Sequence, residues 1–323
     1  MDPLSDSTIF QHSCSVVMPI YNAEKWLRQS LTSILMSMRA NDELVIVNDG
    51  STDGSTEILN EFSVLDSRMT VFTLDHQGLV GALNFGIENA KHEFIARADA
   101  DDTYAARRLD FQLQELIADE DLGAVFTDYE LRDERGRIIG VIPTSLTPNM
   151  TYLSLVNPQR TAHPSVVFRK SAFYMASKYQ EEDFPVEDYA LWLRIVTVSK
   201  ISSVPETLLF YQVHSKSVSR LNRELQLDKV RMLRKTLIAN FPTDFDWKTN
   251  VRFAAKVYSA SSLGNLRSVL AFRDIVATYR IAPGKISLTT LISSFFWLRL
   301  LNMKTFSSIG RLLIYRLRMA NLR

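Results

Sequence analysis

With 323 residues, of which 46% are hydrophobic and 10% aromatic, the chain can bury one large core or one core with an appendage, so we expect a globular protein. The single cysteine, Cys14, excludes an internal disulfide framework, and the opening residues lack the basic and apolar regions of a secretory signal. The net charge of +1 identifies no partner by itself. We expect a cytoplasmic location and no nucleic-acid partner.

The first half of the chain alternates apolar, β-branched runs with segments of helical period, which predicts βαβ units around a mostly parallel sheet. Leucines at helical spacing follow the first strand, and the second strand leads into a turn at 48–55 that is rich in helix-capping residues. The strands expected in this part of the chain are 15–20, 43–47 and 71–74.

The next segment predicts a change in the sheet. Apolar periodicity indicates a helix at 79–87, a strand at 94–98 and a further helix at 109–117. Residues 123–130 and 137–142, joined by Asp-Glu-Arg-Gly, are typical of an antiparallel hairpin. We therefore expect an α/β protein with a mixed central sheet flanked by helices.

From about residue 216 the strand signals stop and patterns of helical period take over. This change divides the chain into a domain at 1–215 and a helical region at 216–323. No internal repeat or low-complexity linker separates them, so we expect the two parts to pack together. The helices expected in the second part are roughly 219–240, 247–262, 265–280, 286–301 and 304–320.

Clustered carboxylates follow one of the predicted buried strands. Asp99, Asp101 and Asp102 would repel one another, and a hard divalent cation that bridges them relieves this repulsion. Such a cluster is also typical of a solvated acidic turn. Polar residues follow two other strands, at 19–22 and at Asp49, and ligands of open α/β sheets bind outside the carboxyl ends of the strands. We therefore expect the three clusters to converge in one crevice.

Four blocks of sequence, in order along roughly residues 13–220, resemble the family 2 glycosyltransferases of the bacterial surface-polysaccharide type. The resemblance implies the GT-A fold, which is Rossmann-like, with a C-terminal all-helical extension here. It also implies that a sugar is transferred from a nucleotide diphosphate to an acceptor hydroxyl. The blocks are Val-Val-Met-Pro-Ile-Tyr-Asn-Ala-Glu at 16–24, Val-Asn-Asp-Gly-Ser-Thr-Asp-Gly-Ser at 47–55, Arg-Ala-Asp-Ala-Asp-Asp at 97–102 and Val-Glu-Asp-Tyr-Ala-Leu-Trp at 186–192.

The resemblance implies roles on the donor side for five residues. Pro19, Tyr21 and Glu24 would line the nucleotide pocket, and Asp49 would contact the base. For Tyr21 and Glu24 the alternative is an ordinary turn and helix start. Gln77 lies where the family has a donor-binding loop that leads into a helix.

The third block corresponds to the family's Asp-x-Asp motif. Its first acid, Asp99, would face the ribose or sugar of the donor, and its second, Asp101, would hold the metal. The metal would be Mn²⁺ or Mg²⁺, which favour oxygen ligands and stabilise the negative charge on a departing diphosphate. His214 resembles a family position after the last strand that can reach the diphosphate or the metal, so we assign it to the metal.

The fourth block contains the acidic pair Glu187-Asp188, at the start of a predicted helix whose Leu191, Ile195 and Val198 face inward. The resemblance places the catalytic base at Asp188, and a single displacement with one base inverts the anomeric centre. Glu187 would contact substrate, although an acid in the first turn also complements the helix dipole.

Several other residues are open between binding and structural roles. His163, in a His-Pro-Ser block, resembles a family position that would contact substrate, but a lone histidine in a strand is more often structural. Arg97, Arg107 and Arg108 flank the acidic cluster, where they can contact phosphate or neutralise the carboxylates. Trp192 is expected in the core.

The end of the chain is strongly basic. After Asp274 there is no acidic residue and there are eight basic ones. The last two predicted helices have apolar faces flanked by arginines, so they can lie on an anionic membrane without spanning it. This would suit a polyprenyl-diphosphate-linked acceptor and a location on the inner face of the cell membrane. The alternative is that both helices complete the core.

We therefore predict an inverting, metal-dependent hexosyl- or N-acetylhexosaminyl-transferase that moves a sugar from a UDP-sugar to a hydroxyl of a glycan or lipid-linked glycan. A sugar-phosphate nucleotidyltransferase would need a glycine-rich basic loop near the first strand, and that loop is missing. A catalytically silent glycan- or lipid-binding subunit is the other alternative, against which the presence of Asp99, Asp101 and Asp188 argues. The lack of a Gln-x-x-Arg-Trp motif disfavours a processive synthase.

Overall fold

The computed structural model describes residues 12–144, 161–215 and 217–239. The chain divides into two compact units, of which the first comprises Met1–Thr151 and Asn157–Leu233 and the second comprises Tyr152–Val156 and Arg234–Arg323. The described strands all belong to the first unit. The domain boundary at 215/216 stays a prediction, and the helices expected beyond residue 240 lie outside the described residues.

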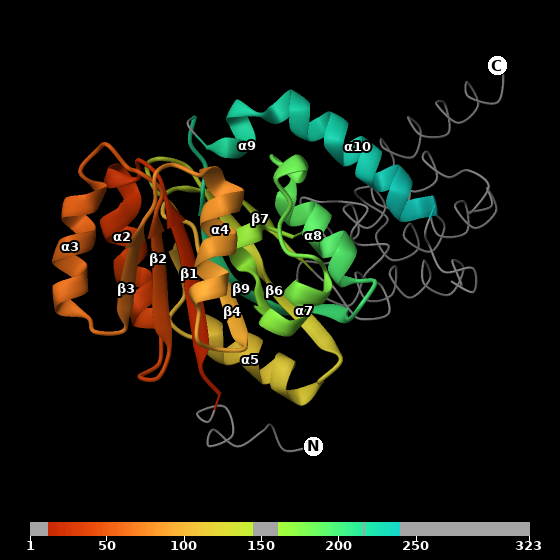
Figure 1. The fold of residues 1–323 in the computed structure, drawn as a ribbon, viewed down its shortest axis with the longest axis horizontal. Helices are drawn as coiled ribbons and strands as arrows, with labels where there is room; N and C mark the ends of the chain where they lie inside the picture. The colour runs from red at the N-terminus through yellow and green to blue at the C-terminus, as the bar shows by residue number, and fades with distance from the viewer. Residues whose placement is uncertain (1–11, 145–160, 216, 240–323) are drawn as a thin grey trace, which may run out of the picture. The chain divides into compact units, whose positions relative to one another are not determined.

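Four parallel strands form the first half of the sheet, in the order β3-β2-β1-β4, as the alternation of strands and helices predicts (Figure 1). Three of them, β1, β2 and β4, are buried along their whole length, which is typical of parallel strands covered on both faces. The strands are β1 (Cys14–Ile20), β2 (Glu43–Asn48), β3 (Met69–Thr73) and β4 (Phe94–Arg97).

The sheet becomes mixed at β8 (Val167–Arg169), which runs antiparallel to β4 and to β6 (Leu122–Arg132). Next to β6 lies β9 (Lys200–Gln212), which is parallel to it and pairs at its other edge with β5 (Thr103–Tyr104). The predicted hairpin is formed by β6 and β7 (Ile138–Ile142). The prediction of a mixed α/β sheet is confirmed.

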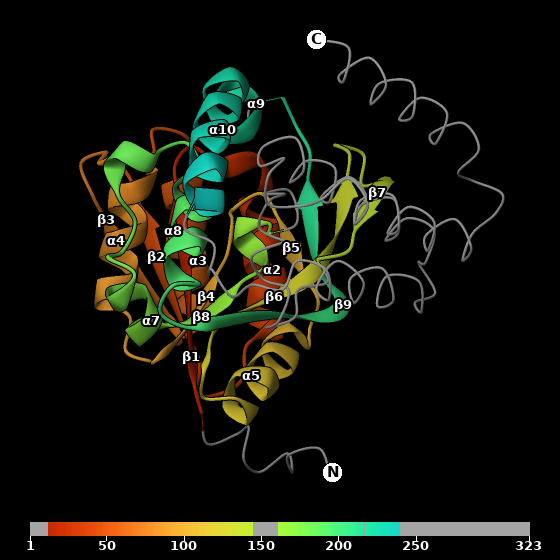
Figure 2. The ribbon, with the colours of Figure 1, turned by 90° about the vertical axis from the view of Figure 1, so that its right-hand side faces the viewer.

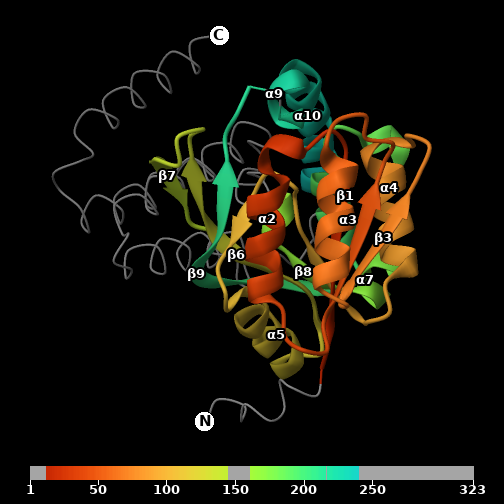
Figure 3. The ribbon, with the colours of Figure 1, turned by 90° about the vertical axis from the view of Figure 1, so that its left-hand side faces the viewer.

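Helices cover both faces of the sheet: α2 (Glu24–Ser37), α3 (Ser55–Leu65), α4 (Gly78–Asn89), α5 (Arg108–Ala118), α7 (Lys170–Met175) and α8 (Glu187–Ile195). Side chains alternate along β1, so Val16 and Met18 join a core cluster with α2, α3 and α5. Val17 points the other way, toward Gly86 of α4, where an added Cβ would lie 2.6 Å from Val17 Cγ1. Figures 2 and 3 show α4 and α7 on one side of the sheet and α2 and α5 on the other.

The structure corrects two expectations about local structure. His163 lies in a 3₁₀ helix, η3 (His163–Ser165), and not in a strand. Val198 was expected to face inward on α8, but this helix ends at Ile195 and Val198 is 43% exposed.

The helix predicted at 219–240 is two helices, α9 (Val218–Leu221) and α10 (Arg223–Ala239). A second 3₁₀ helix, η4 (Glu181–Asp183), precedes α8. Within the described part of the chain, no helix is both long enough and apolar enough to cross a membrane.

Candidate active site

The carboxyl ends of β1, β2 and β4 meet at one edge of the sheet. The amide of Asp49, after β2, donates a hydrogen bond to the carbonyl of Ile20 at the end of β1 (2.8 Å). The amide of Ala98, after β4, donates to the carbonyl of Val17 in β1 (3.1 Å). The backbone segments that carry the polar residues after the three strands therefore begin close to one another.

Asp49 fixes the start of α4. Its carboxylate accepts hydrogen bonds from the amides of Gln77 (2.6 Å) and Gly78 (2.9 Å), and Gly78 has a φ of +82°, a conformation that favours glycine. These contacts leave Asp49 only 3% exposed. The structure thus joins two residues assigned to the donor side, Asp49 and Gln77, while their contacts with a nucleotide stay predictions.

Tyr21 and His76 form a flat aromatic surface beside Asp49. Their rings stack with centroids 4.1 Å apart, and the Nδ1 atom of His76 lies 3.0 Å from the carbonyl oxygen of Asp49. Tyr21 is 51% exposed and the His76 side chain 55%, so this surface is open to solvent. Sequence reasoning missed His76, whose only signal is its place in the loop before Gln77.

Glu24 joins the loops after β1 and β2. Its carboxylate accepts a hydrogen bond from the amide of Gly54 (3.1 Å), and its own amide donates to Asp53 Oδ2 (3.0 Å). These are the contacts of a helix start, which was the structural alternative for Glu24. Pro19 is paired with Val47 in the sheet. The roles of Glu24 and Pro19 in a nucleotide pocket stay predictions.

An acidic cluster follows β4. Asp99, Asp101 and Asp102 each offer one carboxylate oxygen, and the three atoms lie within 4.8 Å of one another. His214 joins them from beyond β9, with its Nε2 atom 2.7 Å from Asp101 Oδ2. The amide of Gln212, the last residue of β9, donates to Asp102 Oδ1 (2.7 Å). The end of β9 therefore delivers a histidine to the acidic cluster.

The electrostatics of this cluster fit a divalent cation. Burial, reinforced by Asp101 and Asp99, raises the pKa of Asp102 well above its usual range. Burial also raises the pKa of Asp99, against the effect of Arg97 and with the support of Asp101. Asp102 Oδ2 is buried and has no hydrogen-bond partner among the described residues. Carboxylate oxygens suit Mn²⁺ or Mg²⁺, and either cation would relieve the repulsion.

The three arginines beside the cluster differ in their surroundings. Arg97 is 2% exposed and forms an ion pair with Asp99 (2.6 Å), so it neutralises one carboxylate. Arg108 is fully buried, and its Nη2 atom donates to the carbonyls of Arg97 and Val166 at 2.9 Å each. Arg108 therefore stabilises the backbone at the end of β4. Arg107, in contrast, is exposed.

Glu187 and Asp188 begin α8, close enough to Asp99 for its charge to raise both of their pKa values. Burial raises the pKa of Asp188 to about 6, opposed by the backbone amide of Tyr189 and reinforced by Asp99. Burial, reinforced by Asp188, raises the pKa of Glu187 to about 8. At neutral pH Asp188 is therefore mostly ionised, whereas Glu187 is mostly protonated.

His163 lies beside Glu187. Its side chain is 10% exposed, with Nε2 2.6 Å from the hydroxyl oxygen of Tyr179 and Nδ1 4.0 Å from Glu187 Oε1. Burial and the charge of Arg97 hold the pKa of His163 well below its usual range, so the ring is neutral. Its contact with substrate stays a prediction, and Tyr179 was not identified from the sequence. The expected core position of Trp192 is confirmed, since it is fully buried.

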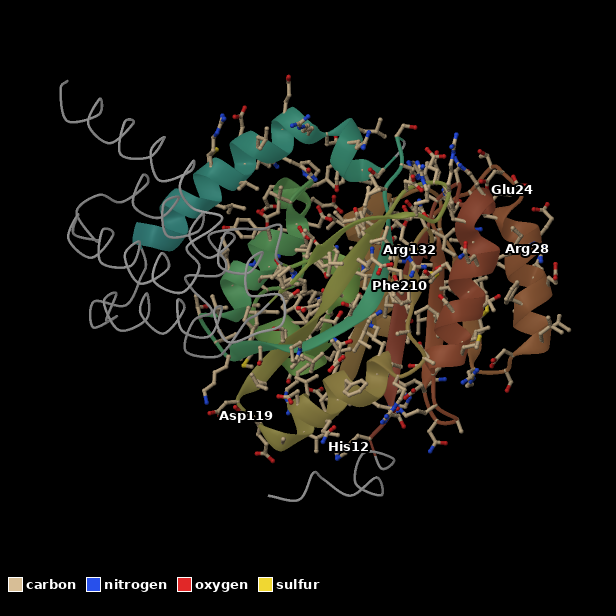
Figure 4. All side chains as sticks on the ribbon, turned by 180° about the vertical axis from the view of Figure 1, so that it is seen from behind. His12, Glu24, Arg28, Asp119, Arg132 and Phe210 are labelled. Atoms are coloured by element: carbon tan, nitrogen blue, oxygen red, sulfur yellow. The ribbon has the colours of Figure 1, made fainter. Side chains whose placement is uncertain are left out.

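A separate groove of about 510 Å³ opens between α2 and the edge formed by β5 and β9. Figure 4 shows Arg132 and Phe210 together on this side of the sheet, with Arg28 on α2. Both arginines are paired, Arg28 with Glu61 (2.6 Å) and Arg132 with Glu130 (2.7 Å), and Arg132 also lies over the ring of Phe210. The groove therefore contributes no uncompensated charge to the site.

Comparison with known proteins identifies the family. Residues 15–180 match the family model described as Glycosyl transferase family 2. The chain belongs to glycosyl transferase family 2. A relative in Escherichia coli, the O-antigen biosynthesis glycosyltransferase WbnJ, is 31% identical over 212 residues, which cover 64% of this chain and 82% of WbnJ. The predicted family is confirmed.

Two solved structures show the same fold as this family 2 protein. Staphylococcus aureus TarS in complex with UDP has a TM-score of 0.56 and 19% identity, covering 84% of this chain and 81% of that one. The mannosyltransferase PcManGT of Pyrobaculum calidifontis, in complex with GDP-Man and Mn²⁺, has a TM-score of 0.56 and 18% identity, covering 93% of this chain and 84% of that one. The predicted GT-A fold is confirmed for the described residues.

Proposed function

We propose that this family 2 glycosyltransferase is an inverting, metal-dependent hexosyl- or N-acetylhexosaminyl-transferase. It would move a sugar from a UDP-sugar to a hydroxyl of a surface glycan or of a polyprenyl-diphosphate-linked glycan. The observation that carries the proposal is a half-buried, ionisable Asp188 that lies close enough to Asp99, in the metal-type cluster, for the charge of Asp99 to raise its pKa. The UDP complex of TarS and the role of WbnJ in O-antigen biosynthesis support the classes of donor and product.

On the donor side, we assign the nucleobase to the exposed ring of Tyr21. Asp49 holds the adjacent loop in place through the amides of Gln77 and Gly78, and we assign it to the edge of the base. Asp99, whose charge is compensated by Arg97, would face the ribose or the sugar. On these assignments, the reacting sugar would lie between the acidic cluster and the start of α8.

We assign the cation to Asp101 and His214, with Asp102 beside them. A bound Mn²⁺ or Mg²⁺ supplies Lewis-acid stabilisation of the negative charge on the leaving diphosphate. Because Arg97 already compensates Asp99, the charge left for a cation to neutralise comes from Asp101 and Asp102.

We assign the general base to Asp188. The amide of Tyr189 holds Asp188 Oδ1 (2.7 Å), which leaves Oδ2 for the proton of the acceptor hydroxyl. As the acceptor oxygen bonds to the anomeric carbon, its proton passes to Asp188 and the bond from that carbon to the diphosphate oxygen breaks. A single displacement of this kind inverts the anomeric centre. Glu187, protonated at neutral pH, does not compete for the proton.

Donor hydrolysis without acceptor tests the proposal. The protein should hydrolyse at least one nucleotide sugar from a panel of UDP-Glc, UDP-Gal, UDP-GlcNAc, UDP-GalNAc and GDP-Man, and EDTA should stop the reaction. Asp188→Asn should lower turnover by about 10² to 10⁴-fold with UDP affinity nearly unchanged. Asp228→Asn, an exposed site on α10, is the matched control. Normal turnover by Asp188→Asn would remove this residue from the base role, and EDTA-resistant turnover would remove the metal.

We also propose that residues 1–215 are the catalytic domain and that 216–323 provide attachment to an anionic membrane on its cytoplasmic face. The two helices on which attachment depends, at 286–301 and 304–320, lie outside the described residues. Deleting 286–323 should abolish sedimentation with phosphatidylglycerol vesicles, and unchanged sedimentation would reject attachment through this segment.

A further inference from the structure

We propose that Tyr179 and His163 form a positioning pair that fixes the first turn of α8 and so aims Asp188 at the donor. This inference rests on the proposed role of Asp188 as the base. The pair is joined by a hydrogen bond of 2.6 Å between the Tyr179 hydroxyl and His163 Nε2. Tyr179 comes from the loop after α7, and His163 from η3.

His163 contacts α8 at two points. Its Nδ1 atom lies 4.0 Å from Oε1 of Glu187, the first residue of the helix, and its ring packs edge-on against Trp192 with centroids 6.0 Å apart. Glu187 and Trp192 are more than one helical turn apart, so a ring that touches both restrains where the helix begins and how it is rotated about its axis. Asp188 lies between these two contacts and takes its direction from them.

Tyr179 is anchored in turn to the helix that carries the donor-side loop. The side chain of Asn84 in α4 donates to the carbonyl of Tyr179 (3.0 Å) and accepts from its amide (3.3 Å). Gln77, the N-cap of the same helix, and Gly78, its first residue, are held by Asp49. The contacts that would position Asp188 therefore extend to α4, and Asp49 fixes the start of this helix on the proposed nucleotide side.

Tyr179 and His163 are polar, although apolar side chains of similar size would also fill this space. Tyr179 is 2% exposed and its ring lies 5.4 Å from that of His163, in a region that also contains the fully buried Trp192. A buried hydrogen bond selects one orientation of the imidazole, which apolar packing alone does not. Because Tyr179 is almost fully shielded, its hydroxyl is placed to orient His163 and not to contact substrate.

Steady-state kinetics test the pair, with whichever nucleotide sugar of the panel the parent enzyme hydrolyses fastest and with Mn²⁺. Tyr179→Phe removes only the hydroxyl and should lower kcat roughly tenfold, because small misplacements of a reacting group are costly, with the donor KM unchanged. His163→Gln, which keeps a polar atom at the Nε2 position, should retain more activity than His163→Ala. Tyr174→Phe, at a tyrosine that is 42% exposed, is the matched control and should equal the parent.

Hydrogen exchange gives a readout that does not depend on turnover. Amides at 187–191 should exchange faster in Tyr179→Phe than in the parent and in Tyr174→Phe. Parent-like kcat and parent-like exchange in Tyr179→Phe would overturn the proposal. A raised donor KM with unchanged kcat would also overturn it, because the pair would then bind substrate. If Asp188→Asn were fully active, the base assignment would fail, and the exchange measurement would still decide whether the pair fixes α8.

Discussion

The Nε2 atom of His214 lies 2.7 Å from Oδ2 of Asp101, although the two residues are 113 positions apart in the chain. The contact depends on β9, whose last amide, that of Gln212, is held by the neighbouring Asp102. Two successive carboxylates of the acidic cluster therefore fix the end of β9 and the histidine beyond it. The proposed cation site is thus assembled from the middle and the end of the predicted domain at 1–215.

Replacing His214 with alanine should weaken Mn²⁺ binding roughly tenfold or more, because the imidazole is both a proposed ligand and a partner of Asp101. Isothermal titration with Mn²⁺ in the presence of UDP measures this change. His12→Ala is the control, since His12 precedes β1 and is exposed at the opposite edge of the sheet (Figure 4). A dissociation constant equal to that of the parent would contradict the assignment of His214.

Asp102→Asn should stabilise the metal-free protein at pH 8. The raised pKa of Asp102 means that its ionised form costs the folded state free energy, a cost that is absent near pH 4 and grows as pH rises above the pKa of an unfolded aspartate. The free energy of unfolding, measured by urea denaturation in EDTA, should therefore be higher than that of the parent at pH 8 and close to it at pH 4. Mn²⁺ should raise the Tm of this variant less than that of the parent. Equal stabilities at pH 8 would show that the charge of Asp102 is already compensated.

The pH profile of kcat should have an acid limb near 6 and a weaker alkaline decline near 8. Asp188 accepts a proton only when ionised, so turnover falls as pH drops through its raised pKa of about 6. Above about 8, Glu187 ionises beside Asp188 and adds a second buried charge. Glu187→Gln should keep the acid limb and lose the alkaline decline, as measured between pH 5 and 9.5. An acid limb at pH 4 would instead indicate a base with an ordinary carboxyl pKa.

Tyr21→Ala should raise the dissociation constant of UDP about three- to tenfold, because an aromatic pair contributes about 0.5 to 1.5 kcal/mol beyond its buried area. Tyr21→Phe keeps the ring and should bind UDP like the parent. Fluorescence or calorimetric titration distinguishes the two variants. Equal affinity of Tyr21→Ala and the parent would move the nucleobase away from the Tyr21–His76 surface.

The sequence predicted the parallel strands of the first half well because their apolar runs are local signals, whereas β5, β8 and β9 received no predicted range. The run at 15–20 became Cys14–Ile20, and the run at 43–47 became Glu43–Asn48. The error at Val198 has a local cause: the apolar spacing continued past Ile195, but the helix did not. Apolar patterns in the sequence therefore predicted the positions of these elements better than the residues at which they end.

Motifs in the sequence pointed to candidate site residues, whose roles stay predictions. Asp99, Asp101 and Asp188 stood out by their acidic neighbours, whereas His76 and Tyr179 act through partners far away in the sequence. Tyr179 meets His163 only after η3 and the segment beyond α7 have folded against α8. Because no local pattern encodes such a meeting, these contacts required the structure.

The reversed strand β8 divides the chain between most of the residues that we assign to the donor and the proposed base. The residues that we assign to the nucleotide and the sugar, Tyr21, Asp49 and Asp99, precede it in the chain, whereas the proposed base Asp188 and the proposed metal ligand His214 follow it. On these assignments, an altered loop on the later side would reshape the space for an incoming hydroxyl while β1–β4 still hold Tyr21 and Asp49 in place for the nucleotide. Within such an architecture, a new linkage can arise without a new donor.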